Sequence, residues 1–337
     1  MKLEQLFNFT NGKSIVNLEK GNYPIYGSTG IIGSSNKSLI SGSNILIARV
    51  GQNCGYTQYT ESDCWVSDNT IIASSNTDLL IPKYGYYLLG SLNLQKYKIG
   101  AAQPLLTIGI IKSIECSIPQ ISIQQHIVNT IGSVDDLIEN SNKKIKKLMS
   151  LGLIKINLLN SKKDKIDLSS ITKFEKGNEL GSSNYFDYYK DNFINYIRVG
   201  DLLSLSNTYV DKNICNKFVE EEDILIAMDG APGRNAIGLN GSYSSGLYKM
   251  LCNKDKKGLV YFELNSDLNQ NIIKNMSQGT TILHASKSIP FLKTIEIDEK
   301  ENEYFNNIFN EIFILKKKVS LLKNIKDKLL IKYFTNQ

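Results

Sequence analysis

Three arginines stand out among the 39 basic residues of this chain: Arg49, Arg198 and Arg234. Each falls at the edge of an expected strand or turn, whereas lysine supplies the rest of the positive charge. The arginine guanidinium is planar and can donate two parallel hydrogen bonds, as it does to O6 and N7 of guanine in the major groove of DNA. Confinement of arginine to three such places indicates bidentate recognition, with chance placement as the alternative.

Amide, hydroxyl, aromatic and lysine side chains near these arginines complete a candidate DNA-binding set. Asparagine and glutamine suit adenine, and the small residues at 27–30 and 33–36 would let the chain approach a sugar-phosphate backbone closely. Each residue taken alone is explained at least as well as a turn or surface residue. The predicted DNA-binding residues are Lys13, Ser28, Thr29, Ser35, Asn36, Lys37, Arg49, Gln52, Asn53, Tyr56, Gln58, Asn69, Arg198, Arg234, Asn235, Ser244, Ser245, Tyr248 and Lys249.

Common catalytic and metal-binding patterns are absent from the sequence. The stretch 11–14 lacks the upstream glycine of a phosphate-binding loop, and no Asn-Pro-Pro or Asp-Pro-Pro of an amino-methyltransferase occurs. Five cysteines form no CxxC pair and only two histidines are present, so no metal site is predicted. The acidic cluster at 296–299 with Lys300 fits helix N-terminal charges better than a nuclease site. We expect no catalytic residue and no bound cofactor.

The composition is that of an ordinary globular protein. The 337 residues are 42% hydrophobic and 21% charged, with a net charge of +6, and this length favours two domains. No run of about 18 apolar residues occurs, so no membrane span is expected. The chain opens on Met1 without a secretory signal, and the odd number of cysteines fits a reducing compartment. A cytoplasmic location is therefore predicted.

The chain repeats itself. The segment Gly42–Gly51 aligns with Glu221–Gly230, Lys112–Cys116 aligns with Lys293–Ile297, and Gly12 matches Gly177. Several matches in the same order indicate a duplicated unit and therefore two structurally similar halves. Each half should contain short strands separated by Gly, Ser and Asn turns, and a helical piece. The expected strands are Ile45–Val50, Thr70–Ala73, Ile224–Met228 and Ser244–Leu251; the expected helical pieces are Tyr84–Tyr97 and its partner Asp267–Met276.

A long helix follows each globular block. Its apolar residues step by alternating fours and threes, and such a heptad seam needs a partner helix, unless each helix packs on its own block. A helix of about 35 residues would be roughly 50 Å long and could act as a spacer. The predicted seam and subunit-docking residues are Ile127, Ile131, Val134, Ile138, Ile145, Leu148, Ile308, Ile312, Leu315, Val319, Leu322 and Leu329, with Ser141 at one step of the first seam.

The positive excess lies in these helical stretches. Residues 121–165 hold 8 basic and 4 acidic residues, and residues 299–337 hold 8 and 5. Lysines at 143, 144, 146 and 147 and at 316–318 account for much of it. They form either a solvated helix face or a basic strip that faces phosphates or an acidic partner.

Five segments together resemble the specificity subunits of type I restriction–modification systems. The resemblance covers almost the whole chain, and the order, spacing and duplication of the segments make it specific. Glu299–Glu303 departs from the pattern, because it stands where the first copy has Ile121–Gln125. The segments are Gly21–Gly33, similar to the opening of a target recognition domain; Ile45–Gly51 with Trp65–Asn69; Ile118–Ile127, similar to the entry into the spacer helix; Ile194–Leu202; and Leu329–Phe334.

The resemblance implies two tandem α/β (α+β) target recognition domains separated by a long antiparallel two-helix coiled coil. It places domain 1 at 1–120, the central spacer helix at 121–165, domain 2 at 166–298 and the C-terminal spacer helix at 299–337. It also implies a non-catalytic subunit for DNA methylation and host defence. Each domain would read one half of a bipartite double-stranded DNA target.

The implied partners are two methyltransferase subunits and, in the full complex, motor and nuclease subunits. S-adenosylmethionine, ATP and Mg²⁺ would belong to those partners rather than to this chain. Three alternatives stay open: a nuclease or methyltransferase in its own right, a specificity subunit of a methylation-only or type II-like fused system, and a stand-alone DNA-binding protein or scaffold.

Overall fold

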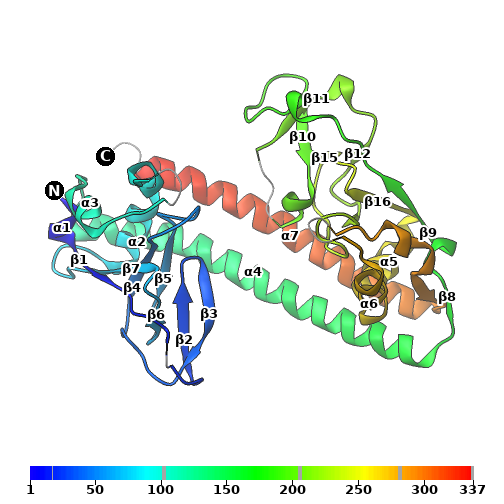
Figure 1. Cartoon of the computed structure of the whole chain (residues 1–337), viewed down its shortest axis with the longest axis horizontal. Coiled ribbons are helices and arrows are strands. Elements are labelled where there is room, and N and C mark those ends of the chain that lie inside the picture. Colours follow the sequence, from blue (N-terminus) through cyan, green and yellow to red (C-terminus); the bar gives the residue numbers. More distant parts are fainter. Residues whose placement is uncertain (17, 101–103, 204–206, 280–282, 335–337) are drawn as a thin grey trace. The chain divides into compact units, whose positions relative to one another are not determined.

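The computed structural model describes residues 1–16, 18–100, 104–203, 207–279 and 283–334, and the chain divides into two compact units. Unit 1 comprises Met1–Leu137 and Leu322–Gln337, and unit 2 comprises Ile138–Leu321. The long helices α4 (Ile121–Lys162) and α7 (Glu299–Phe334) each contribute one part to unit 1 and the other part to unit 2 (Figure 1). The predicted domain boundaries at 120, 165 and 298 therefore stay a prediction, because the units divide within the helices rather than at their ends.

The described residues of unit 1 form two sheets and three short α-helices, besides the segments of the long helices. One sheet is fully antiparallel, in the order β1-β7-β4-β5, and the other has the order β3-β2-β6 with β2 and β6 parallel. The elements are α1 (Leu3–Leu6), β1 (Phe7–Asn11), β2 (Tyr23–Gly27), β3 (Gly30–Ser35), β4 (Asn44–Ala48), β5 (Thr57–Thr60), β6 (Trp65–Val66), β7 (Thr70–Ser75), α2 (Pro82–Ser91) and α3 (Ile108–Ser113).

Unit 2 has the same strand order in its main sheet, β9-β16-β13-β14, and again a parallel pair, β10 with β15, in the second sheet. A two-stranded sheet pairs β8 with β17. The elements are β8 (Lys165–Asp167), β9 (Thr172–Lys176), β10 (Phe193–Ile197), β11 (Tyr209–Asp211), β12 (Phe218–Val219), β13 (Leu225–Ala227), β14 (Asn235–Ala236), β15 (Gly241–Tyr243), β16 (Leu247–Cys252), α5 (Lys257–Asn265), α6 (Asp267–Met276) and β17 (Lys293–Ile295).

Equivalent hydrogen bonds confirm the duplication residue by residue. The backbone N–H of Gly12 donates to the carbonyl of Thr70 at 2.9 Å, and that of Gly177 donates to the carbonyl of Leu247, also at 2.9 Å. After β4, the N–H of Arg49 donates to Asn69 O at 2.9 Å; after β13, Met228 N donates to Gly246 O at 3.0 Å. The alignments of Gly12 with Gly177 and of Gly42–Gly51 with Glu221–Gly230 are therefore confirmed.

Two other sequence alignments are wrong. Lys293 of β17 pairs with Asp167 of β8, and the equivalent bridge in unit 1 joins Glu115 to Lys2. The counterpart of Lys293 is therefore Glu115 rather than Lys112. The shared Lys-x-Ile-Glu pattern is displaced by three residues between the copies. The predicted helical piece at 84–97 is divided into α2, which ends at Ser91, and a 3-10 helix at Leu94–Tyr97. The predicted helix Asp267–Met276 is present as α6, but the helix that corresponds to α2 is α5 rather than α6.

Each long helix buries an apolar face in both units. In unit 1, Ile127 and Ile131 of α4 are buried with Phe334 of α7 in the core beneath β1, β4 and β7. In unit 2, Ile156 of α4 is buried with Ile308 and Ile312 of α7 against α5. Most of the predicted seam residues are therefore buried or half-buried, as a heptad pattern requires.

Ion pairs give the direction in which the helices run. Asp135 of α4 pairs with Lys326 of α7 at 2.6 Å in unit 1, and Lys144 pairs with Glu311 at 2.6 Å in unit 2. Within each unit, residues early in one helix thus face residues late in the other. The predicted antiparallel pairing of the two helices is confirmed in both units.

Gly12 and Gly177 lie against backbone that leaves no room for a side chain. A Cβ atom at Gly12 would lie 2.1 Å from the carbonyl oxygen of Ser67, and one at Gly177 would lie 2.3 Å from that of Ser244. Gly12→Ala and Gly177→Ala should each lower the free energy of unfolding by about 1–3 kcal/mol, because the backbone must move to make room for the methyl group. Urea unfolding measures this.

The control for both variants is Gly109→Ala. A Cβ at Gly109 in α3 meets nothing within 4 Å, so alanine should stabilise that helix slightly, by roughly 0.5–1 kcal/mol. Equal stability of Gly12→Ala and Gly109→Ala would contradict the close approach of the backbone.

Glu263 of α5 is a fully buried carboxyl group in unit 2. Burial raises its pKa to about 7, although the amide of Asn160 donates to Oε2 at 2.9 Å and opposes the shift. Between about pH 4.5 and pH 7 the folded protein therefore holds a proton that the unfolded chain has released, so stability falls as pH rises through this window.

Glu263→Gln should remove this pH dependence, because glutamine is neutral throughout. At pH 8 the variant should be more stable than the parent by up to about 3 kcal/mol, since one pKa unit corresponds to about 1.4 kcal/mol. Urea unfolding at pH 5 and pH 8 measures the difference. The exposed Glu303→Gln serves as the control, and a parent protein whose stability rises from pH 5 to pH 8 in step with that of Glu263→Gln would refute the buried proton.

Candidate nucleic-acid interface

Four of the predicted DNA-binding residues of unit 1 come together at one end of its sheets. Ser28 Oγ, in the turn between β2 and β3, donates to the carbonyl of Asn69 at 3.3 Å. Gln58 Nε2 on β5 donates to Gly27 O at 2.9 Å, and the N–H of Arg49 donates to Asn69 O at 2.9 Å. We call Ser28, Arg49, Gln58 and Asn69 the unit 1 cluster.

The loop between β4 and β5 adds more polar residues beside this cluster. Gly51 and Gly55 adopt φ angles of +78° and +90°, which favour glycine, and they turn the chain tightly at both ends of the loop. Gln52 and Asn53 are exposed between them, and Tyr56 is 50% exposed. Amides and an aromatic ring are thus presented to solvent beside Arg49.

Three other predicted residues lie away from the cluster. Ser35, Asn36 and Lys37 lie at the opposite end of the β2–β3 hairpin, about 15–20 Å along a strand of this length. Ser35 is fully buried, and its hydroxyl accepts from the N–H of Lys37 at 3.0 Å. Asn36 donates to the Glu19 carboxylate at 3.0 Å. Thr29 lies next to Ser28, and Lys13 is exposed next to β6, where its carbonyl accepts from Trp65.

The arginines differ in their surroundings. Among the described residues, Arg49 and Arg234 form no ion pair, so both guanidinium groups can bind a ligand without breaking one. Arg198 lies 3.7 Å from Asp201 and donates to Thr208 at 3.0 Å, and its guanidinium carbon lies 5.9 Å from the ring centroid of Tyr185. Arg198 is thus oriented by its own unit.

Arg49 and Arg234 do not occupy equivalent positions. The position of Arg49 is taken in unit 2 by Met228, which is 0% exposed. The carbonyl oxygen of Arg234 accepts a hydrogen bond from Ala227 N at 2.7 Å, and the carbonyl oxygen of Tyr56 accepts one from Ala48 N at 2.8 Å. Arg234 therefore corresponds to Tyr56, and the two units offer different side chains at the same places of a shared fold.

Other predicted residues of unit 2 are engaged within the protein. Asn235 and Asn265 exchange amide hydrogen bonds, both of 3.0 Å. Lys249 lies 3.7 Å from Glu175 and 3.9 Å from Asp223. Ser244 and Tyr248 are buried, and Ser245 Oγ donates to Glu179 at 3.4 Å. A role for these residues in DNA binding stays a prediction.

Unit 2 has a cavity of about 480 Å³ at the loops that follow β10 and β13. Tyr185, Arg198 and Asp229 line it, and Tyr185 donates a hydrogen bond to the Glu179 carboxylate. Burial and this hydrogen bond raise the pKa of Tyr185 well above its usual value, so the phenol stays a donor. His284 Nδ1 lies 2.8 Å from Asp229 Oδ1 at the same loop.

Sequence reasoning missed Glu179, Tyr185, Asp229 and His284. Asp229 directly precedes Gly230, the counterpart of Gly51, so the duplicated turn could have identified it. His284 has no local signal, because it reaches Asp229 from 55 residues further along the chain.

The long helices also leave apolar side chains in solvent. On α4, Leu151, Ile154 and Leu158 are 53%, 66% and 46% exposed, and their spacing places them on one face. The predicted seam residues instead face the interiors of the two units, so a docking role for them stays a prediction. Lys143, Lys144 and Lys317 form ion pairs with Glu139, Glu311 and Glu221, which divides the predicted basic strip.

Within the described ranges, no group of three or more His, Cys, Asp or Glu residues is arranged to hold a metal ion. None of the helices in the part of the chain that the structure covers is both long and apolar enough to span a membrane.

Comparison with known proteins gives matches of different extent. Residues 1–150 match the family model of the type I restriction modification DNA specificity domain. The Type I restriction enzyme EcoprrI specificity subunit of Escherichia coli is 27% identical over 115 residues, which is 34% of this chain and 28% of that protein. The sequence match thus spans little more than a quarter of that relative.

The fold similarity extends further. The crystal structure of the Type-I restriction-modification system S subunit from M. genitalium superposes with a TM-score of 0.62 at 19% identity, over 99% of this chain and 95% of that chain. The predicted fold class of two α/β units with long paired helices is confirmed. The resemblance to type I specificity subunits is confirmed as well.

Proposed function

We propose that this chain is the DNA sequence-specificity subunit of a type I restriction–modification complex. The observation that carries the proposal is the duplicated unit, whose first copy lies within the match to a DNA specificity domain except for its C-terminal helical segment. Two copies of one fold suit a target made of two separate half-sites. Each unit would read one half-site of a double-stranded DNA from the major groove.

The differences between the two units support two different half-sites. Arg49 in unit 1 is replaced by the buried Met228 in unit 2, and Tyr56 is replaced by Arg234. The backbone around these positions is the same, so the fold does not require the exchange. A bidentate arginine contact contributes about 1–3 kcal/mol of discrimination between bases.

The proposed partners are two methyltransferase subunits, with motor and nuclease subunits in the full complex. The exposed apolar face of α4, formed by Leu151, Ile154 and Leu158, is the surface we assign to a methyltransferase subunit. S-adenosylmethionine, ATP and Mg²⁺ would bind to those partners. We further propose that this chain is non-catalytic and works in the cytoplasm.

Two alternatives make different predictions. A methylation-only system would methylate its target without restriction, and in a type II-like fused system the neighbouring genes would encode no separate motor subunit. A stand-alone DNA-binding protein would bind its target alone and would not co-purify with a methyltransferase. Co-expression with the adjacent open reading frames, followed by mapping of methylated adenines, separates all three.

Arg49→Ala should relax or abolish methylation at one half-site, and Arg234→Ala should do so at the other. Loss of a bidentate contact should weaken discrimination by roughly 10- to 100-fold, with assembly unchanged. Methylome sequencing of cells that express each variant measures this. Arg49→Lys is the matched control for charge: it should keep DNA affinity but lose discrimination. An unchanged motif at unchanged efficiency in both alanine variants means that these residues do not read bases.

Leu151→Glu combined with Ile154→Glu should prevent co-purification of the methyltransferase subunit, because two charges would be buried in an apolar contact. Phe291→Glu makes the same type of change at a residue that is 53% exposed and outside the long helices, and should have no effect. Thermal unfolding checks that both variants fold. A folded double variant that still co-purifies in full would exclude this face of α4 as the docking site.

A further inference from the structure

A second cavity of unit 2 lies at the end of the main sheet where β9 begins and β16 ends. It has a volume of about 710 Å³ and is lined from the start of β9, the end of β16 and the beginning of α5. The ladder between β9 and β16 runs from Lys176 opposite Tyr248 to Thr172 opposite Cys252. Because each residue of a strand advances about 3.3 Å, this ladder separates the cavity from Gly177 and Ser244 by roughly 15 Å.

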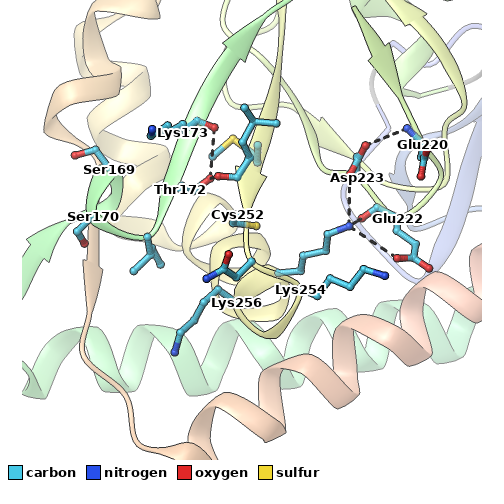
Figure 2. A pocket seen from close by; sticks show the side chains of 15 residues that line it. Ser169, Ser170, Thr172, Lys173, Glu220, Glu222, Asp223, Cys252, Lys254 and Lys256 are labelled. Carbon is cyan, nitrogen blue, oxygen red and sulfur yellow. Dashed lines mark hydrogen bonds and ion pairs between the residues drawn. The ribbon is translucent and has the colours of Figure 1, made fainter.

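Lysines dominate one part of this cavity. Lys173, Lys254 and Lys256 line it, and none of them forms an ion pair with a residue that the structure describes. Figure 2 shows Ser169, Ser170 and Lys173 on one side of the cavity and Glu220, Glu222 and Asp223 on the other. In this view Lys256 also extends away from the carboxylates, whereas Lys254 extends toward Glu222.

The carboxylates on the other side are largely compensated. Lys257 Nζ lies 3.4 Å from Asp223 and 3.9 Å from Glu222, and Lys249 lies 3.9 Å from Asp223. Between the two sides, burial raises the pKa of the Cys252 thiol to about 11, so this residue is neutral at physiological pH. The three unpaired lysines are thus free to hold an anion.

The duplicated fold shows that the lysines are not needed to build this part of the structure. The equivalent cavity of unit 1, of about 390 Å³, is lined by Glu4, Asn8 and Asn76 among others. Matching hydrogen bonds place Asn8 at the position of Lys173 and Leu79 at that of Lys256, since Leu79 N donates to Asn76 O as Lys256 N donates to Asn253 O.

The same alignment of the two units assigns the remaining positions that line the cavity. Lys254 and Lys257 correspond to Thr77 and Leu80, and Ser169 corresponds to Glu4. Unit 2 therefore carries four lysines where unit 1 carries uncharged residues, and a neutral hydroxyl where unit 1 carries a carboxylate. It also carries Glu220, Glu222 and Asp223 where unit 1 carries Ser41, Ser43 and Asn44, but of the four lysines only Lys257 forms ion pairs with them among the described residues. Bringing like charges together costs free energy, so an unchanged backbone that carries them indicates a negatively charged ligand.

We propose that the cavity lined by Ser169, Lys173, Lys254 and Lys256 is a phosphate-binding site of unit 2, distinct from the residues predicted to read bases. The ammonium groups bind phosphate oxygens as point charges, and the Ser169 hydroxyl and the Asn253 amide can donate hydrogen bonds to the same oxygens. The phosphate comes either from the backbone of duplex DNA or from a free nucleotide. This inference does not depend on which bases the chain reads.

Lysine footprinting on the full-length protein tests the proposal. Acetylation of individual lysines is measured by mass spectrometry in chloride, in inorganic pyrophosphate and with sheared duplex DNA, all at one ionic strength. We expect pyrophosphate to slow acetylation of Lys173, Lys254 and Lys256 at least threefold. Lys112, which lines the equivalent cavity of unit 1, is the internal control and should be unaffected.

The DNA arm identifies the source of the phosphate. Protection by both pyrophosphate and DNA assigns the site to the DNA backbone, whereas protection by pyrophosphate alone assigns it to a free nucleotide. No protection by pyrophosphate, or equal protection of Lys112, overturns the proposal.

A variant gives an independent measurement. Lys173→Ala combined with Lys256→Ala should weaken pyrophosphate binding at least tenfold in isothermal titration calorimetry, and Lys112→Ala should not change it. Circular dichroism checks that both proteins are folded. Because Lys173 and Lys256 are not among the residues predicted to read bases, the methylation motif of the double variant should be unchanged, which separates this result from a failure of the proposed function. Unchanged pyrophosphate affinity in the folded double variant also overturns the proposal.

Discussion

The burial of an apolar face on each long helix is the constraint on which the rest of the structure depends. In unit 1, Ile127 and Ile131 of α4 complete a core with strands β1, β4 and β7, and in unit 2 Ile308 and Ile312 of α7 do the same against α5. The apolar residues of a heptad seam are removed from water only when a partner packs against them. Neither globular unit has a closed core without its segments of both helices, so the helices belong to the folding units and are more than connectors.

Amide side chains on the helices reinforce this arrangement in both units. Gln124 of α4 accepts from the N–H of Ile81 at 3.0 Å, and Asn306 of α7 accepts from the N–H of Gly258 at 2.9 Å. Both bonds satisfy a backbone donor at the start of a short helix, α2 or α5, which would otherwise lack a partner. The same device at equivalent places shows that the duplicated unit includes the beginning of its long helix.

One fold thus carries two different sets of surface residues. The hydrogen bonds that hold the turns are the same in both units, whereas the side chains at their edges differ: Arg49 against Met228, Tyr56 against Arg234, and Leu79 against Lys256. Backbone interactions of this kind tolerate side-chain exchange, because they use only N–H and C=O groups. Such tolerance is what two independent recognition surfaces on a common scaffold require.

The sequence by itself determined the duplication, the strands around Ile45–Ala48 and the heptad seams, because each depends on local periodicity or on residues at a constant offset. Only the tertiary structure decided that Ser28, Gln58 and Asn69 meet while Ser35 is buried, and that His284 reaches Asp229. It also corrected the alignment at Lys293, where a repeated pattern is displaced by three residues. Contacts between distant segments follow from how the strands pair and pack, and no pattern within one short segment encodes that pairing.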